Sequence, residues 1–476
     1  MPERSLAEWL TLLEARHPAE IDLGLERVAA VWSTIQKERR QQGNAISLPI
    51  AITVAGTNGK GSCLASMQAV ALAHGSRVGL FTSPHFLHYN ERISVQGQPV
   101  DDETIVRAFD EIEAARGDIS LTYFEFGTLA ALVVFVDADL DLMLLEVGLG
   151  GRLDAINIID ADVAVVTSIA LDHQAWLGDT RELIAAEKLG IARPSSPLVI
   201  AEADGPEGFD NMIAATGALP FVINKDFRLQ LETDRFNLTL SPNHGFSLAG
   251  SSLAGSNTLS NSASNSASNS ASNSASNSAS NGVSNVNPQS FQGLPSSGLM
   301  PSNKAAALQA LSCAGFSLDA DKVIAALEGL TLTGRQQKLI VNGCSVILDV
   351  AHNPAAAKAL AKALPPIKGR YLAVASVLND KDWAGIVEPL SAIFAEWRVA
   401  EISASDRATK AQTMHEVLYN AGLSSSLFES VEEAFKSALK EAAKEASKDD
   451  VIVVFGSFHT VSAVLNMQRE SDGCVQ

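Results

Sequence analysis

Short runs of apolar and β-branched residues alternate with helical patterns along most of this chain, and this alternation restricts its fold more than any other feature. The first strand-like runs are PIAITVA (49–55), RVGLFTS (77–83), DLMLLEVG (141–148), DVAVVTSI (162–169) and PLVIAE (197–202). Strands that are apolar throughout are buried on both faces, which is typical of parallel sheets with helices on each side. The pattern therefore predicts an α/β domain with a mostly parallel sheet.

A second series of strand-like runs predicts a smaller, Rossmann-like α/β domain at the C-terminal end. Its runs are SVILDVA (345–351), YLAVAS (371–376), EWRVAEIS (396–403) and DVIVVFGS (450–457). A chain of 476 residues is also too long for one ordinary hydrophobic core. We therefore expect one domain over residues 1–333, closed by helices at 303–314 and 318–328, and another over residues 334–476.

A long segment of low complexity interrupts the first domain. It contains no Asp, Glu, Lys or Arg from Phe236 to Asn303, and residues 261–280 are five tandem copies of NSAS. Small polar residues bury too little apolar area to offset the entropy that is lost on ordering. We therefore expect residues 236–300 to be a disordered, exposed insertion of the kind that surface loops tolerate.

The charge and the cysteines exclude several classes of function. The formal net charge of −19 leaves no basic surplus for broad binding to nucleic acid or to an anionic membrane surface. The four cysteines form no CxxC pair, which fits a reduced cytoplasm. The start of the chain reads as an amphipathic helix and not as a signal peptide, and no stretch is apolar enough to span a membrane. We expect a soluble cytoplasmic protein that binds no nucleic acid and no membrane.

A glycine-rich loop, VAGTNGKGS (54–62), follows the first strand-like run and precedes a helical pattern. A strand, a glycine turn and a helix N-terminus together direct backbone N–H groups at an anion, and the helix dipole adds to the attraction. The spacing differs from the common P-loop, G-x-x-x-x-G-K-[ST], because two residues separate Gly56 from Gly59 and Gly61 follows Lys60. The loop indicates a phosphate site reached by Lys60, and the alternative is a glycine turn with an exposed lysine.

Polar residues follow three of the predicted strands. Ser83, Glu146 and His173 each lie at or just beyond a strand end. Open parallel sheets bind ligands at the carboxyl ends of their strands, and oxygen and nitrogen donors at that edge suit magnesium. Taken singly, Glu146 could be an ordinary strand-end carboxylate and His173 a structural histidine. Together the three residues predict a Mg²⁺ site.

Motifs spread over the chain point to one family. In order, they are IDLGLERV (21–28), GTNGKGS (56–62), TSPH (82–85), ARGDISLTYFE (115–125), LTYFEFGTLAAL (121–132), EVGLGGRLDA (146–155), TSIALDH (167–173), AAEKLGIAR (185–193), DVAHNP (349–354) and GSFHT (456–460). Outside residues 204–300, the chain closely resembles the bifunctional dihydrofolate synthase/folylpolyglutamate synthase family, ATP-dependent relatives of the Mur ligases. The resemblance implies a Mur-ligase-like ATPase domain of P-loop type, in which G-T-N-G-K-G-[ST] replaces the common loop sequence.

The resemblance also implies roles for particular residues. It implies that ATP is bound by Thr57, Asn58, Gly59, Lys60, Asn303, Arg335 and Asp349, and that Mg²⁺ is bound by Ser83, Glu146 and His173. Lys188 matches the lysine that the family carries as a carbamate, a carboxylate-like ligand for a second Mg²⁺. The pterin-bearing substrate is implied to lie against Thr122, Tyr123, Phe124, Glu125, Leu153, Asp154 and Ala155. By the same resemblance, catalysis is assigned to Lys60, Lys188 and His173, and the glutamate side of the cleft to His352, Ser457 and His459.

The activity implied by the resemblance is the ATP-dependent addition of L-glutamate to 7,8-dihydropteroate, and of further glutamates to reduced folates, through an acyl phosphate. We expect a monomer that acts on these small molecules. Two alternatives remain open at this point. A monofunctional folylpolyglutamate synthase would extend reduced folates without using dihydropteroate, and a P-loop ATPase would hydrolyse ATP to drive a partner. The LTYFE segment (121–125) favours the bifunctional enzyme, and the second α/β domain disfavours the ATPase.

Overall fold

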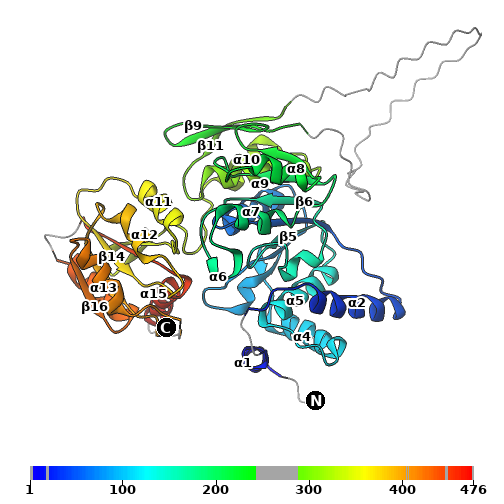
Figure 1. The fold of residues 1–476 in the computed structure, drawn as a ribbon, viewed down its shortest axis with the longest axis horizontal. Helices are drawn as coiled ribbons and strands as arrows, with labels where there is room; N and C mark the ends of the chain where they lie inside the picture. The colour runs from blue at the N-terminus through cyan, green and yellow to red at the C-terminus, as the bar shows by residue number, and fades with distance from the viewer. Residues whose placement is uncertain are drawn as a thin grey trace, which may run out of the picture.

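Two large sheets organise the protein, and each is the centre of an α/β domain (Figure 1). The structure, a computed structural model, describes residues 4–17, 21–242, 288–403, 405, 407–444 and 449–473, with side chains as far as residue 470. A third, three-stranded sheet packs against α9 (Pro301–Cys313) and α10 (Ala320–Leu327) of the larger domain. The two-domain α/β architecture that the sequence predicted is therefore confirmed.

Eight strands form the larger sheet, in the order β4-β3-β2-β5-β1-β6-β7-β8. They are β1 (Ile50–Ala55), β2 (Val78–Phe81), β3 (Ile93–Val95), β4 (Gln98–Pro99), β5 (Leu142–Glu146), β6 (Val163–Val166), β7 (Pro197–Ile200) and β8 (Leu219–Val222). All neighbours pair in parallel except β3 and β4, which add an antiparallel edge. The carboxyl ends of β1, β2, β5 and β6 therefore open onto one edge of the sheet, where ligands bind in folds of this kind.

Helices cover both faces of this sheet because its strands are apolar on both sides. In β5, Leu142 and Leu144 face one hydrophobic core and Met143 and Leu145 face the other. The helices are α1 (Leu6–Arg16), α2 (Glu26–Gln41), α3 (Lys60–Ala73), α4 (Asp102–Arg116), α5 (Tyr123–Asp137), α6 (Gln174–Leu177), α7 (Arg181–Leu189) and α8 (Phe209–Ala215), with 3-10 turns η1 (Tyr89–Arg92) and η2 (Ala155–Ile158). Helices α3, α9 and α10 pack on the Leu142 side, and α1, α2, α4, α5 and α7 pack on the Met143 side.

The low-complexity segment is ordered at both of its ends, which corrects the expectation of disorder over residues 236–300. The three-stranded sheet has the order β11-β10-β9 and consists of β9 (Arg228–Leu231), β10 (Arg235–Thr239) and β11 (Ser290–Pro295). Phe236 and Leu238 are buried in β10, and Phe291 and Leu294 are buried in β11 opposite them. These apolar side chains, and not the absence of charge, decide the structure there. The NSAS copies lie outside the described residues.

The smaller domain is built on a six-stranded sheet of order β12-β13-β17-β14-β15-β16. Its strands are β12 (Gln337–Val341), β13 (Cys344–Leu348), β14 (Tyr371–Ala375), β15 (Phe394–Ala400), β16 (Ser425–Phe428) and β17 (Val451–Phe455). Its helices are α11 (Pro354–Ala363), α12 (Trp383–Val387), η3 (Glu388–Leu390), α13 (Ala411–Asn420), α14 (Val431–Ala442) and α15 (Phe458–Gly473). The sequence predicted β13, β14, β15 and β17 but missed β12 and β16, which are partly exposed strands at the two edges.

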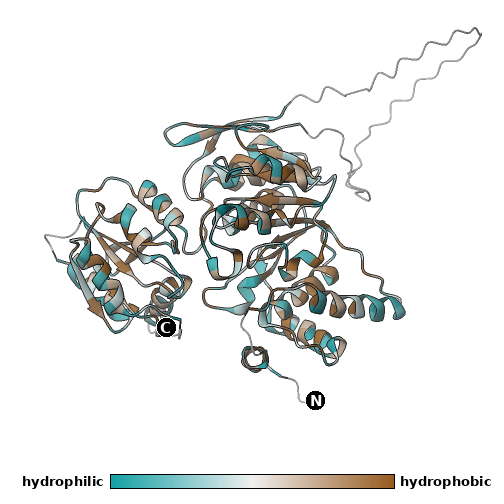
Figure 2. Cartoon of the chain, in the orientation of Figure 1, coloured by the Kyte–Doolittle hydropathy of each residue, from teal (hydrophilic) through white to brown (hydrophobic). Residues whose placement is uncertain are grey.

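Apolar residues concentrate in the strands of both large sheets, as Figure 2 shows. The smaller domain has a core on each face of its sheet, around Trp397 and Phe455 on one face and Phe435 on the other. Within the described ranges, no helix combines the length and the apolarity that crossing a bilayer requires.

Candidate active site

The glycine-rich loop joins β1 to α3, and the end of β6 fixes its backbone. Thr57 N donates to Ser168 O (2.8 Å), and Asn58 N donates to Ser168 Oγ (2.9 Å). Gly59 has φ +91°, a left-handed conformation that favours glycine, and α3 begins at the next residue, Lys60. The predicted strand–turn–helix arrangement is therefore present, and the part of it that suits an anion is the N-terminus of α3, since the N–H groups of Thr57 and Asn58 are bonded to Ser168.

Charged groups from several separate elements surround Lys60, which is half-buried. Its Nζ donates to Gly56 O (2.9 Å). The loss of solvent lowers the pKa of Lys60, the charge of Glu146 opposes that shift, and the charge of Arg335 adds to it. Asn303 is in close contact with the loop, since a Cβ atom at Gly59 would lie 2.7 Å from the side-chain amide of Asn303. The loop is thus enclosed by the residues that the sequence predicted around it.

Glu146 is buried at the end of β5 and contacts the end of β2, where Ser83 lies. Its Oε2 accepts hydrogen bonds from Ser83 N (3.2 Å) and from the hydroxyl of Thr82. In the part of the chain that the structure describes, no lysine or arginine forms an ion pair with Glu146. A buried carboxylate without a cationic partner is costly, and a bound divalent cation would satisfy it.

His173 lies at the N-terminus of α6 in a left-handed conformation (φ +51°, ψ +39°), which is uncommon for a residue with a side chain. Burial lowers the pKa of His173 to about 4, and the charge of Asp172 opposes that shift. The imidazole is therefore neutral near pH 7, which is the form that binds a metal. The described residues contain no cluster of three or more His, Cys, Asp or Glu side chains suited to a metal ion. The predicted set has two such side chains and a serine hydroxyl, and its donors fit Mg²⁺.

Lys188 is a buried lysine on α7, the helix that packs against the glycine run between β5 and η2. Burial, followed by the charge of Lys60, lowers the pKa of Lys188 to about 7. A large fraction of this amine is therefore unprotonated near neutral pH, which is the form that reacts with carbon dioxide. A Cβ atom at Gly151 would lie 2.8 Å from Glu187 O and 3.3 Å from Lys188 Cα, so the glycine run and α7 are in close contact.

Residues 122–125 begin α5, and the Glu125 carboxylate fixes this segment from within the fold. Its Oε2 accepts a hydrogen bond from Thr122 N (2.8 Å), and its Oε1 accepts one from Arg27 Nη2 (3.1 Å). Gly24 N, in the same N-terminal segment, donates to Leu153 O (3.2 Å). Both oxygens of Glu125 are therefore engaged by the protein. Arg27 was not among the residues predicted from the sequence, although the IDLGLERV motif (21–28) contains it.

The two predicted halves of the pterin site meet at the glycine run after β5. A Cβ atom at Gly148 would lie 2.6 Å from the ring of Phe124, and this ring lies 5.9 Å from that of Phe81. Asp154 Oδ2 accepts a hydrogen bond from Leu149 N (2.9 Å), and burial raises the pKa of Asp154 to about 6. Of the other predicted residues, Ala155 is buried, and Tyr123 and Leu153 are half-buried.

Arg335 and Asp349 lie together on the side of the smaller domain that faces the loop. The buried Asp349 carboxylate accepts hydrogen bonds from Gln336 N (3.0 Å) and Ala351 N (2.8 Å). Burial lowers the pKa of Arg335 and raises that of Asp349, and the charge of each opposes the shift of the other. The Arg335 guanidinium also lies 5.5 Å from the centre of the Phe458 ring. The structure therefore brings these two predicted residues together.

A hydrogen-bonded network joins the two domains beside the loop. Asp172 accepts hydrogen bonds from Lys381 Nζ (2.7 Å) and Asn353 Nδ2 (3.0 Å), and its Oδ2 lies 3.3 Å from His352 Nε2. Asn353 and Asn58 exchange hydrogen bonds through their side-chain amides, at 3.1 Å each. Burial would raise the pKa of Asp172, but His352 and Lys381 hold it below the usual range. Lys381 and Asn353 were not predicted from the sequence. The available signals were that Lys381 stands between two aspartates and that Asn353 caps a helix.

Ser457 and His459, predicted on the glutamate side, differ in their surroundings. Ser457 is buried, and its Oγ accepts a hydrogen bond from Thr460 N (3.0 Å) at the start of α15. His459 is exposed, and its charge acts on His85 of the larger domain. Ser457 is therefore engaged within the fold, whereas His459 lies at the boundary between the domains.

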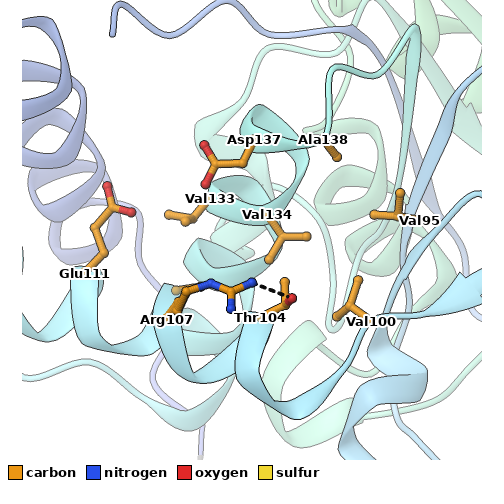
Figure 3. A pocket seen from close by; sticks show the side chains of 10 residues that line it. Val95, Val100, Thr104, Arg107, Glu111, Val133, Val134, Asp137 and Ala138 are labelled. Atoms are coloured by element: carbon orange, nitrogen blue, oxygen red, sulfur yellow. Dashed lines mark hydrogen bonds between the residues drawn. The ribbon is translucent and has the colours of Figure 1, made fainter. Parts of the chain in front are cut away.

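A surface cavity of about 480 Å³ lies apart from these residues, between the β3–β4 edge and helices α4 and α5. Figure 3 shows its wall, formed by Val95, Val100, Val133 and Val134, with Thr104, Arg107, Glu111, Asp137 and Ala138 around them. None of the predicted site residues lines this cavity. They gather instead at the carboxyl ends of the parallel strands and at the boundary between the domains.

Comparisons with known proteins show which family this chain resembles in sequence and in fold. A family model described as Mur ligase, glutamate ligase domain, matches residues 334–458. The dihydrofolate synthase/folylpolyglutamate synthase of Escherichia coli K12 is 39% identical over 474 residues, which cover 98% of this chain and 97% of that protein. A solved structure of E. coli FolC in complex with DHPP and ADP has a TM-score of 0.81 at 37% identity, covering 99% of this chain and 100% of that one. Another, of a bifunctional folylpolyglutamate synthase/dihydrofolate synthase with Mn, AMPPNP and L-glutamate bound, has a TM-score of 0.78 at 36% identity, covering 98% of each chain.

Proposed function

Because the chain belongs to the bifunctional dihydrofolate synthase/folylpolyglutamate synthase family, it is an ATP-dependent glutamate ligase that uses a divalent metal ion, and we propose which of its residues bind ATP, the metal ion and the substrate. Membership of this family also decides against a P-loop ATPase that drives a partner. One observation supports these residue assignments above all others. Charged residues from both domains converge on Lys60, and they include Glu146, Asp172 and Arg335.

We propose that the loop residues Thr57, Asn58, Gly59 and Lys60 hold the phosphates of ATP. The left-handed turn at Gly59 and the start of α3 at Lys60 support this role, because N–H groups and a cation then point to one place. Asn303, which touches the loop, is assigned to the adenine side. Arg335 and Asp349 are assigned to ATP contacts from the smaller domain. ATP then binds between the domains.

Ser83, Glu146 and His173 are assigned to one Mg²⁺, and Lys188, as a carbamate, to a second. Three observations support these assignments: the buried carboxylate of Glu146, which forms no ion pair with a described lysine or arginine, the neutral imidazole of His173 and the lowered pKa of Lys188. When bound, Mg²⁺ supplies positive charge beside the phosphate oxygens, which lets a second anion approach them.

The pterin-bearing substrate is assigned to the segments 122–125 and 153–155. Phe124 offers a ring to a flat heterocycle, whereas both oxygens of the buried Asp154 carboxyl group already accept hydrogen bonds, from Leu149 N (2.9 Å) and Ile156 N (3.0 Å). Glu125 has a different role from Phe124, since both of its oxygens are bonded within the fold. It positions the segment, and Arg27 holds it there.

The chemistry that these assignments support begins with two anions brought together. An oxygen of the acceptor carboxylate attacks the γ-phosphorus of ATP, the bond from that phosphorus to the β–γ bridging oxygen breaks, and ADP leaves. The amine of glutamate then attacks the acyl carbon, loses a proton and displaces phosphate. Lys60 and Arg335 supply fixed positive charge for the first step. The Asp172 network closes the domains over the acyl phosphate and keeps water from it.

The test of this mechanism follows one oxygen atom. An acceptor whose carboxylate carries heavy oxygen is incubated with the enzyme, ATP, Mg²⁺ and glutamate, and the released phosphate is analysed by mass spectrometry. The acyl-phosphate route transfers one heavy oxygen to each phosphate released with product. Phosphate free of heavy oxygen, formed together with product, would exclude the acyl phosphate.

We also propose the boundary between residues 333 and 334, a cytoplasmic location and a monomeric state. The change of sheet between β11 and β12, and the start of the matching glutamate ligase domain at residue 334, support the boundary. The scattered cysteines support the cytoplasmic location. Size-exclusion chromatography with light scattering tests the monomer.

A further inference from the structure

Arg92 places a guanidinium between the predicted metal-binding and pterin-binding segments. Its backbone O accepts a hydrogen bond from Thr82 N (2.9 Å), so the residue lies beside the carboxyl end of β2. Its Nε donates to His85 Nδ1 (2.8 Å). The guanidinium carbon lies 5.5 Å from the ring centres of both Tyr89 and Tyr123. Two rings and an imidazole therefore hold the planar group in one orientation.

Arg92 has no carboxylate to pair with in the described ranges of the chain. The adjacent acid, Glu91, is turned to the backbone, where its Oε1 accepts from Leu87 N and His88 N (2.8 Å each) and its Oε2 accepts from Phe86 N (2.7 Å). The Nη1 and Nη2 atoms of Arg92 make no hydrogen bond to any residue that the structure describes. A held guanidinium with both Nη atoms available matches the bidentate geometry of a carboxylate.

The two substrates of the proposed function differ by one carboxylate. Dihydropteroate carries a single carboxylate, which is the one that reacts. A folate carries a glutamyl residue with two carboxylates, of which one reacts and the other does not. Placing the second charge in a partly buried site requires a cation, and Lys60 and the metal ligands are committed to the reacting end.

We propose, building on the function proposed above, that Arg92 binds the non-reacting carboxylate of the folate substrate. Tyr123 supports one side of the guanidinium and belongs to the pterin segment, so a folate bound there extends past Arg92 towards the loop. His85 is a positioning residue, because its Nδ1 accepts the hydrogen bond from Arg92 Nε and so fixes the guanidinium. The site thereby accepts a substrate with one carboxylate and gains affinity for a substrate with two.

The test compares wild-type, Arg92→Gln and Arg92→Lys enzymes on dihydropteroate and tetrahydrofolate, with saturating ATP, Mg²⁺ and glutamate. A charge-assisted bidentate contact corresponds to about 10–100-fold in affinity, so the ratio of kcat/KM for tetrahydrofolate to that for dihydropteroate falls by this factor in Arg92→Gln. The loss lies mainly in KM, and Arg92→Lys, which keeps the charge without the fork, lies between. The matched control is Arg107→Gln on α4, where Arg107 Nη2 donates to Thr104 Oγ1 (2.8 Å), and this variant keeps the wild-type ratio.

A second measurement needs no variant. Wild-type enzyme is given tetrahydrofolate in which the non-reacting carboxylate is converted to an amide. The analogue loses the same factor as Arg92→Gln, and the variant shows no further loss on it. An analogue as good as tetrahydrofolate, or an equal loss of Arg92→Gln on both substrates, overturns the proposal. Failure of the wild-type enzyme to use either natural substrate overturns the proposed function instead.

Discussion

Replacing Lys381 by methionine tests whether a buried ion pair holds the two domains together at the active site. Lys381 Nζ donates to Asp172 Oδ1 (2.7 Å) and lies 3.0 Å from Asp380 Oδ2, and the side chains of Lys381 and Asp172 are each 6% exposed. Asp172 belongs to the larger domain and precedes His173, whereas Lys381 belongs to the smaller domain. Methionine keeps most of the apolar stem and removes the charge.

The contacts that remain set the expected cost. Removing one member of a buried ion pair costs about 3–5 kcal/mol when the other charge is left unpaired. Asp172 keeps its hydrogen bond from Asn353 (3.0 Å), and Asp380 keeps its ion pair with Arg407 (3.4 Å). The expected cost is therefore that of one hydrogen bond to a charged group, about 1.5–3 kcal/mol. Because the pair spans the domains, this cost falls on their closed arrangement and not on the folding of either domain.

The assay follows glutamate ligation and ATP hydrolysis together. Lys381→Met lowers kcat/KM for glutamate by about 10–100-fold, and more ATP is hydrolysed per glutamate added because water reaches the acyl phosphate. Lys410→Met is the matched control, since Lys410 Nζ pairs with Glu401 Oε2 at 2.9 Å but its side chain is 74% exposed. Such a pair contributes about 0–1 kcal/mol, and its loss leaves both rates unchanged. A folded Lys381→Met enzyme with wild-type kinetics would refute the reasoning.

Three further predictions concern the loop, a buried lysine and the metal. Gly59→Ala destabilises the protein by about 1–3 kcal/mol and weakens ATP binding, because φ at Gly59 is +91° and the new Cβ would lie 2.7 Å from the Asn303 amide. Thermal unfolding with and without ATP measures both effects. Gly75→Ala, at φ +83° with no atom within 4 Å, is its control, and equal losses of ATP binding contradict the role of that contact. Burial lowers the pKa of Lys304 to about 8 from 10.5, so the unfolded state binds the proton more tightly between these values and the free energy of unfolding rises with pH there. Lys304→Met removes this rise in urea titrations, and a slope that persists in the variant disproves its origin in Lys304. Chelation of divalent metal abolishes glutamate addition, and added Mg²⁺ restores it. The Glu146→Gln variant needs a higher Mg²⁺ concentration for half-maximal activity, and a variant with the wild-type Mg²⁺ dependence contradicts the assignment of Glu146 as a metal ligand.

Strands buried on both faces were the elements that the sequence predicted best. Residues 142–145 and 451–455 are apolar without interruption, and burial in a parallel sheet requires no other pattern. Edge strands carry a weaker signal, because half of their residues face solvent. That is why β12 and β16 were missed. Strands β10 and β11 were mistaken for part of a disordered insertion because the low-complexity residues between them dominate the composition of that segment.

The loop and the strand ends of the site were also predicted from the sequence, since a glycine turn before a helix and polar residues after strands are local patterns. Contacts between residues that are distant in the sequence could not be predicted in this way. Arg27 reaches Glu125 across 98 residues and Lys381 reaches Asp172 across 209, and no local pattern pairs them. The engagement of Glu125 and Ser457 within the fold likewise depends on their three-dimensional surroundings. The burial that lowers the pKa of Lys188 to about 7 is a further property of the packed structure.

Product mass after incubation with each acceptor decides whether one enzyme performs both ligations. Purified protein is given ATP, Mg²⁺ and L-glutamate with either 7,8-dihydropteroate or tetrahydrofolate, and products and phosphate are quantified. We expect both acceptors to gain one glutamyl unit at first, with one phosphate released for each unit added. A product from tetrahydrofolate alone would identify a monofunctional folylpolyglutamate synthase. Phosphate release that needs neither acceptor would contradict a ligase altogether.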